Sequence, residues 1–158
     1  VARAFSGSKS LKLGGGDAVD KLVYVAPAPA QFFEAELYLQ DWATTTSRLK
    51  LEPGISELVF SAQKISAVHG DGAGGTAVTV LPGTYSPTQW HKIGIAMDYA
   101  ARRWSVVVDG GALGRLQDLR FKNDATDNLL GIRFEGDQYA DDVKTSSPPS
   151  MVKDWTRY

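Results

Sequence analysis

The sequence predicts an all-β fold, an antiparallel sandwich of two sheets, and three observations support it. Short runs of alternating apolar and polar residues recur along the chain, and no run shows the period of a helix longer than one or two turns. Turn-forming residues separate these runs, with 16 Gly and 7 Pro in 158 residues. The longest alternating stretch, residues 90–110, indicates a hairpin. About ten to twelve short strands with turns between them are typical of a sandwich.

The hairpin at residues 90–110 contains the clearest strand pattern in the chain. Its first strand alternates up to Asp98, its second begins near Arg103, and Asp109-Gly110 ends the second one. The connector is too short for a helix that could pack independently, which favours a direct reversal. In the first strand, His91, Ile93, Ile95 and Met97 fall on one face, with Lys92, Gly94 and Ala96 on the other; in the second, Trp104, Val106 and Val108 alternate with Arg103, Ser105 and Val107.

The other predicted strands follow from the same alternation. Before the hairpin they cover residues 4–13, 21–25, 31–41, 47–51, 57–60, 63–69 and 76–80; after it they cover 112–121, 129–134 and 140–144. The run at 31–41 is also compatible with a helix, because Glu, Ala and Leu are good helix formers. Its aromatic residues and period of 2 favour a strand, with Glu36 and Tyr38 on the face opposite Leu37.

Composition and charge limit the classes of function. The formal net charge is -1, and acidic and basic residues are scattered, which disfavours nucleic acid or an anionic membrane as partner. No apolar run approaches the roughly 20 residues that span a bilayer. The absence of Cys excludes disulfides, thiolate metal sites and Cys nucleophiles.

The chain is predicted to form one domain over residues 1–145, with a tail over 146–158 packed on the same domain and Trp155 docking that tail. Val1 suggests a processed terminus or a module taken from a longer polypeptide.

Three motifs occur in an informative order. Residues 4–13 contain A-x-S-G-x-x-S-L-x-L, residues 90–110 contain W-x-K-I-x-I-x-x-D and then W-x-V-x-V-D-G, and residues 132–143 contain IRF and then YADDV. Together they resemble the opening, late and closing strands of concanavalin A-like and laminin-G-like jelly-roll domains, in particular bacterial carbohydrate-binding modules. This fold class hosts lectins, glycan-binding modules, hydrolases and lyases, so the resemblance implies a fold more specifically than an activity.

The resemblance implies a structural calcium ion. Adjacent residues Asp141 and Asp142 in a strand are expected to point to opposite faces, and a carboxylate turned inward is costly unless it is paired. In the resembling modules such an Asp joins main-chain carbonyls of the opening turn, which here means Asp142 or Asp141 with carbonyls near Ser8 and Lys9. Oxygen ligands of this kind suit calcium. Alternatively, this Asp caps a turn or pairs with Lys or Arg.

A sugar-binding surface is the second candidate site. Glu36 and Tyr38 share one strand face, Arg48 lies on the polar face of its strand, and Arg133 flanks two apolar residues in the same way. If these strands are neighbours, their planar, charged and aromatic groups suit a sugar. Trp42 follows a strand and could form a stacking platform in a loop, whereas Trp90 and Trp104 are predicted to be core. The alternative is an ordinary solvated sheet face.

We therefore expect a non-catalytic module that binds a poly- or oligosaccharide. It would be a secreted or cell-surface bacterial domain, monomeric, and would keep a neighbouring catalytic domain of an exported enzyme near its substrate. One alternative is a laminin-G-like spacer or interaction domain without sugar affinity. Another is a polysaccharide lyase or hydrolase that uses His91 or Tyr38, although the sequence has no zinc-ligand His spacing, no G-x-S-x-G elbow and no P-loop.

Overall fold

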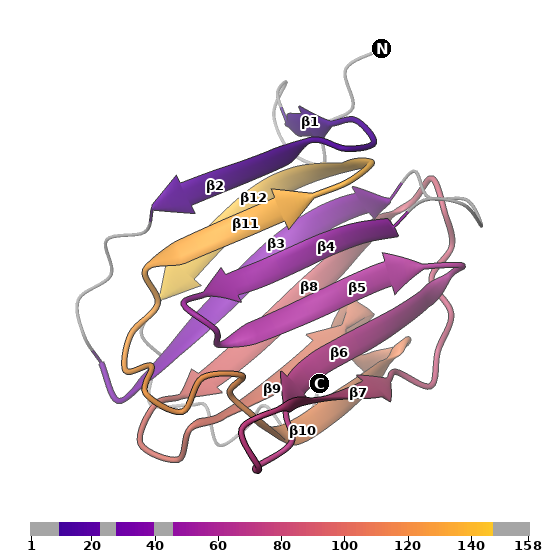
Figure 1. Ribbon diagram of the computed structural model, residues 1–158. Helices are drawn as coiled ribbons and strands as arrows, with labels where there is room; N and C mark the ends of the chain where they lie inside the picture. The colour runs from indigo at the N-terminus through magenta and orange to yellow at the C-terminus, as the bar shows by residue number, and fades with distance from the viewer. Residues whose placement is uncertain (1–9, 23–27, 40–45, 147–158) are drawn as a thin grey trace.

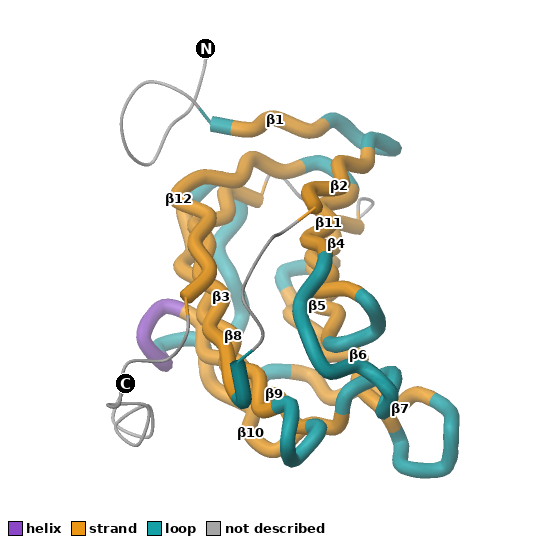
Figure 2. The backbone as a smooth tube through the Cα atoms, turned by 90° about the vertical axis from the view of Figure 1, so that its left-hand side faces the viewer, coloured by secondary structure: helices purple, strands orange, loops and turns teal. Residues whose placement is uncertain are grey.

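The computed structural model describes residues 10–22, 28–39 and 46–146, which form a two-layer β-sandwich (Figures 1 and 2). One 3-10 turn, η1 (Asp109–Gly111), interrupts the strands. The described strands are β1 (Leu11–Leu13), β2 (Ala18–Leu22), β3 (Ala30–Leu39), β4 (Thr46–Glu52), β5 (Ser56–Ser61), β6 (Lys64–Gly70), β7 (Thr76–Val80), β8 (Trp90–Asp98), β9 (Arg103–Val108), β10 (Gly114–Arg120), β11 (Gly131–Glu135) and β12 (Gln138–Ser146).

The strands form two antiparallel layers. The first sheet has the order β1-β12-β3-β8-β9-β10, and the second has the order β7-β6-β5-β4-β11-β2. In Figure 1 the second sheet is nearer the viewer, and Figure 2 shows the two layers edge on. The predicted fold class, an antiparallel two-sheet sandwich, is confirmed.

A single residue pair, Arg120 opposite Gly70, joins the two sheets where β10 meets β6. A Cβ atom at position 70 would clash with the main-chain carbonyl of Phe121, so only glycine lets the two strands approach this closely. The pair therefore closes one side of the sandwich.

The hydrophobic core fills the space between the layers. Alternate residues of β3, including Phe33 and Leu37, face Leu49 and Leu51 of β4 in the opposite sheet. The predicted alternation of the central hairpin is present: the His91 face of β8 and the Trp104 face of β9 are buried, and Trp104, predicted to be core, is 1% exposed. Burial of such large apolar side chains is the main force that holds the sheets together.

Several element boundaries differ from the prediction. The predicted strand at 21–25 is β2, which begins earlier, at Ala18. The predicted strand at 112–121 is β10, which begins at Gly114 and whose register with β9 shifts between Leu116 and Leu119. Residues 147–158 lie outside the described residues, so the predicted tail stays a prediction. No helix in the described ranges is long and apolar enough to cross a membrane.

Candidate functional site

Three hollows lie on the outer face of the first sheet, the face turned away from the core. Small residues form the middle of this face, because Gly94 and Ala96 of β8 pair with Val107 and Ser105 of β9. The hollows have volumes of about 380, 180 and 340 Å³. Depressions form where short side chains lie between longer polar side chains. This face is therefore the candidate site.

The hollow of about 380 Å³, here called the Glu36 hollow, lies where β12, β3 and β8 run side by side. Glu36 of β3 pairs across the sheet with Lys92 of β8 and Asp141 of β12. The residues that line the hollow are Glu34, Ala35, Glu36, Lys92, Asp142 and Lys144. It therefore combines carboxylates that accept hydrogen bonds with ammonium groups that donate them.

Glu36 is the most buried charged group in this hollow, with 8% of its surface exposed. Burial raises the pKa of Glu36; Lys92 opposes this effect, and the negative charges of Asp109, Asp142 and Glu34 add to it. Lys92 is engaged elsewhere, because its Nζ lies 3.3 Å from Glu34 Oε1.

A β-bulge in β12 changes the expected orientation of the two adjacent aspartates. The register with β3 shifts between Asp141 and Lys144, and Asp142 has a φ of 47°. Asp142 therefore lines the Glu36 hollow on the same outer face where Asp141 pairs with Glu36. The prediction that the two side chains point to opposite faces is wrong, because a bulge breaks the period of 2.

The calcium prediction finds only part of its ligand set in the described residues. Asp141 Oδ1 accepts a hydrogen bond from Asp142 N at 2.8 Å, and the ammonium groups of Lys92 and Lys144 line the same hollow as Asp142. No group of three or more His, Asp or Glu residues in the described ranges could hold a metal ion. Because calcium requires six or more oxygens, these residues alone do not fit it. The Lys9 carbonyl lies outside the described residues, so the full set stays untested.

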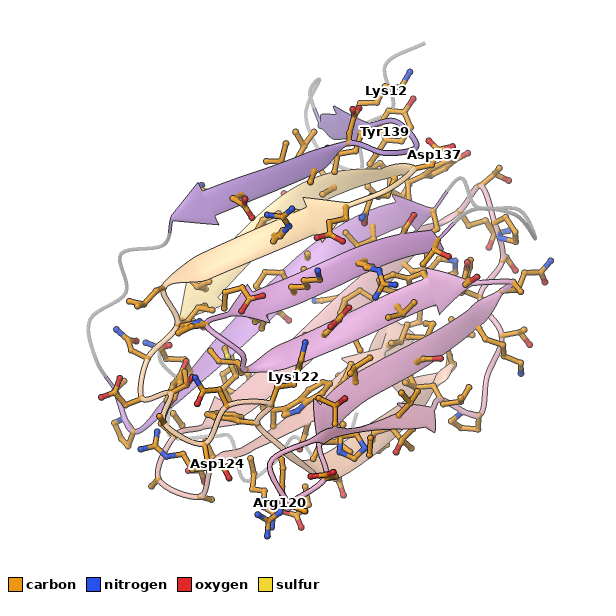
Figure 3. The ribbon with its side chains drawn as sticks, viewed as in Figure 1. Lys12, Arg120, Lys122, Asp124, Asp137 and Tyr139 are labelled. Carbon is orange, nitrogen blue, oxygen red and sulfur yellow. The ribbon has the colours of Figure 1, made fainter. Side chains whose placement is uncertain are left out.

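An aromatic row crosses the outer face beside the Glu36 hollow. Tyr38 packs edge-on against Trp90 and Tyr139, with ring centroids 5.5 and 5.8 Å apart. The Lys12 ammonium lies 5.8 Å from the Tyr139 ring centroid (Figure 3). Tyr38 is only 3% exposed, so it supports the row and does not offer an open stacking surface. Trp90, predicted to be core, is half-buried on the outer face.

The two predicted arginine ligands lie on the outer face of the second sheet. β4 and β11 are neighbours, and Glu135 pairs directly with Arg48 and Arg133 with Lys50. Because β3 belongs to the first sheet, Arg48 and Arg133 cannot share a groove with Glu36. The prediction of one surface from all these strands is therefore wrong. Trp42, the predicted loop platform, lies outside the described residues.

The charges on the second sheet form ion pairs with one another and with Lys122, which follows β10. The contacts are Arg48–Glu57 at 2.5 Å, Lys122–Glu57 at 2.6 Å, Lys50–Glu135 at 2.8 Å, Arg133–Glu135 at 2.6 Å and Arg133–Asp20 at 2.7 Å. Burial would raise the pKa of Glu57, but the hydrogen bonds from Lys122 and Arg48 outweigh it and lower that pKa. Hydrogen bonds from Lys50 and Arg133 also lower the pKa of Glu135. Such satisfied charges suit a solvated structural face.

His91, a residue of the lyase alternative, is fixed by two hydrogen-bond acceptors. Its Nδ1 lies 2.7 Å from Asp109 Oδ2, and its Nε2 lies 2.8 Å from the Ser86 carbonyl oxygen. Both ring nitrogens are thus occupied in a side chain that is 4% exposed. This arrangement joins β8 to η1 and leaves no ring nitrogen for proton transfer with a substrate.

Sequence reasoning missed several residues of the outer face. Lys92 and Lys144 line the Glu36 hollow, and Arg103 and Asp118 line the hollow at the other end of the face. The signal for this face was the alternation of β8, which places Lys92, Gly94 and Ala96 on the side opposite the core residues. A long polar side chain followed by two short ones indicates a solvent-facing surface with a depression at its centre. The position of Lys144 depends on the bulge, and nothing in the sequence pattern marks it.

Comparisons with known proteins support the fold. No family model and no curated protein sequence matches this chain. Among solved structures, a sialidase matches with a TM-score of 0.69 and 15% identity, over 96% of this chain and 16% of that one. Sheep galectin-11 in complex with glycerol matches with a TM-score of 0.56 and 11% identity, over 85% of this chain and 99% of that one.

The binding domain of botulinum neurotoxin serotype D also matches, with a TM-score of 0.58 and 12% identity, over 93% of this chain and 41% of that one. The chain thus spans a small part of the sialidase, under half of the toxin domain and nearly all of the galectin. These likenesses confirm a concanavalin A-like jelly-roll fold, and at this level of identity they concern the fold alone.

Proposed function

We propose that this chain is a carbohydrate-binding module and that the outer face of the first sheet binds a poly- or oligosaccharide. The observation that carries the proposal is the composition of the three hollows, where carboxylates and cations surround a floor of small residues. A sugar hydroxyl both donates and accepts hydrogen bonds, so it needs both kinds of partner. The shared fold with galectins and a toxin binding domain supports this class of ligand.

The geometry of the face suits an extended glycan. Two of the hollows share Ala96 and Ser105, and the Glu36 hollow lies on the same face next to half-buried Trp90. A chain of sugar rings lying across β12, β3, β8, β9 and β10 could occupy successive hollows. The indole of Trp90 offers a flat apolar surface at one side of this path.

We further propose a non-catalytic role as an accessory module of an exported bacterial enzyme. The occupied ring nitrogens of His91 support this, because a lyase or hydrolase that used His91 would need one of them. The module would act as a monomer, keeping an attached catalytic domain near its polysaccharide. The calcium ion at Asp141, Asp142 and the opening turn remains part of the proposal.

A laminin-G-like spacer is the second candidate, favoured by the second sheet. The outer face of that sheet carries the satisfied ion pairs, and its edge strand β7 exposes Val78 and Val80, of which Val78 is 61% exposed. A domain that contacts only neighbouring protein would use such a face and would show no affinity for sugars.

A binding screen on the isolated chain tests both candidates. The chain would be titrated with a panel of soluble polysaccharides, with calcium and then with a chelator, while the same mixtures are assayed for cleavage. Binding without cleavage is the expected result. Cleavage would contradict the non-catalytic role, and no binding to any polysaccharide would favour the spacer. Loss of binding or stability on chelation would support the calcium ion.

A further inference from the structure

Glu36 and Lys144 line the same hollow from neighbouring strands, β3 and β12. Within the described residues, neither side chain forms a hydrogen bond or an ion pair, and they do not pair with each other. A buried acceptor and an exposed donor thus face one volume of about 380 Å³. This arrangement leaves room between them for a group that both donates and accepts.

Glu36 offers the hollow a hydrogen-bond acceptor. The residue is only 8% exposed, but its carboxylate oxygens are not among the fully buried, unpartnered polar atoms of the described residues, so they open to the hollow. A ligand hydroxyl that donates to this carboxylate would supply a donor that the described residues do not. The groups around it do not supply the donor. Lys92 from β8 pairs with Glu34, and Asp142 from the β12 bulge is itself an acceptor.

We propose that the Glu36 hollow is the anchoring subsite for an uncharged sugar, with one hydroxyl donating to Glu36 and an adjacent hydroxyl accepting from Lys144. The inference rests on the proposed function and narrows its ligand to neutral polysaccharides. A hydroxyl pair on adjacent ring carbons suits this geometry, because one hydroxyl can donate to the carboxylate while its neighbour accepts from the ammonium.

The charges along the outer face argue for a neutral ligand. The charged residues that line the three hollows are the carboxylates Glu34, Glu36, Asp98, Asp118 and Asp142 and the cations Lys92, Arg103, Arg115 and Lys144. Because the two signs are nearly balanced and interspersed, the face has no large excess charge to attract a polyanion or a polycation. In the hollow itself, Lys144 disfavours an ammonium group and the three carboxylates disfavour a uronate.

The test compares charged and neutral polysaccharides on wild-type protein and variants. The neutral probes are laminarin, galactan, xylan and mannan, and the charged probes are polygalacturonate and chitosan. The variants are Glu36→Gln and Lys144→Met, with Asp124→Asn and Lys64→Met as controls that make the same charge changes at exposed positions away from the hollow. Thermal melting is recorded for each protein, and Lys144→Met keeps the test valid if Glu36→Gln does not fold, because Lys144 is exposed.

We expect at least one neutral probe to bind and neither charged probe to bind more tightly. Glu36→Gln should weaken binding by about tenfold, as for loss of a hydrogen bond to a charged group. Lys144→Met should also weaken it, and both controls should bind like wild type. Neutral binding that neither variant weakens, or tighter binding of polygalacturonate or chitosan, would overturn this inference and leave the proposed function standing. No binding to any probe would overturn both.

Discussion

His91 Nδ1 and Asp109 Oδ2 lie 2.7 Å apart, and this contact favours the protonated form of the histidine. Because the Asp109 carboxylate and the Ser86 carbonyl are both acceptors, hydrogen bonds to the two require a proton on each ring nitrogen of His91, so these contacts favour the imidazolium form. Asp109 also accepts a hydrogen bond from Lys92 N at 2.8 Å. One carboxylate thus joins the start of β8 to η1, directly after β9.

This contact predicts a pH-dependent stability. Burial lowers the pKa of His91, but the hydrogen bonds to Asp109 and Ser86 outweigh it and raise that pKa. The folded state then binds the proton more tightly than the unfolded state, so the stabilisation is complete below the unfolded pKa and is lost as pH rises through the raised pKa. Asp109→Asn should destabilise the protein by about 2 kcal/mol at acidic pH and less at alkaline pH.

Urea unfolding at several pH values from about 5 to 9 measures this effect, since the range covers the titration of histidine. Asp124→Asn, which removes a carboxylate from an exposed turn, is the control. If the free energies of unfolding of Asp109→Asn and wild type run parallel across this range, His91 does not carry the charge assigned to it.

The junction between the sheets gives a second prediction. Gly70→Ala should destabilise the protein by about 2 kcal/mol, because the new Cβ meets the Phe121 carbonyl and the backbone must move. Gly15→Ala is the matched control, since a Cβ there meets no atom within 4 Å. Denaturant unfolding of the two variants measures the difference. Equal stability would show that β6 and β10 separate without cost.

The core and the central hairpin follow from the sequence because one local rule, alternation, decides both. The same rule could have placed Trp90: if His91 faces the core, its neighbour in the strand faces outward. The prediction that Trp90 is core was wrong because it was based on the size and apolar character of tryptophan and not on the position of Trp90 in the alternation.

The candidate site could not be predicted in the same way, because it depends on pairing between distant strands. β3 and β4 are consecutive, yet they lie in different sheets, and this separates Glu36 from Arg48 by the thickness of the sandwich. Lys144 reaches the Glu36 hollow only through the bulge at Asp142. The alternation of apolar and polar residues reveals neither that consecutive strands lie in different sheets nor that a bulge adds a residue to a strand.

The raised pKa of Glu36, the proposed binding residue, predicts that its ionised carboxylate lowers the free energy of unfolding. The groups that face it are Glu34, Lys92, Asp109, Asp141, Asp142 and Lys144. Because the folded state holds the Glu36 proton more tightly, stability falls as pH rises from the ordinary pKa of a glutamate through the raised value. Glu36→Gln should therefore be as stable as wild type at about pH 4 and more stable by up to about 1 kcal/mol at pH 7.

Urea unfolding at the two pH values checks this prediction. The comparison variant is Glu34→Gln, on the same strand face, whose carboxylate is paired with Lys92 and should give no gain at neutral pH. A lower stability of Glu36→Gln at pH 7 would mean that a group of the protein already donates a hydrogen bond to the carboxylate. Glu36 would then not need a donor from a ligand.

The separation of the two outer faces gives the last prediction. Glycan binding should not change in Arg48→Met or Arg133→Met, because both residues lie on the second sheet, where Glu57 and Glu135 pair with them. Stability should change instead. Glu57→Gln should lower the free energy of unfolding by about 1–2 kcal/mol at neutral pH, because Arg48 and Lys122 lose the buried carboxylate with which they pair.

The cost of Glu57→Gln should disappear in acid. The lowered pKa of Glu57 means that its stabilisation is present above the ordinary pKa of a glutamate and is lost as pH falls through the lowered value. Isothermal titration with the neutral polysaccharide that binds wild type, together with urea unfolding at acidic and neutral pH, separates the two effects. Weaker binding in Arg48→Met or Arg133→Met at unchanged stability would move the sugar site to the second sheet, because those side chains are too far from the Glu36 hollow to act on a ligand held there.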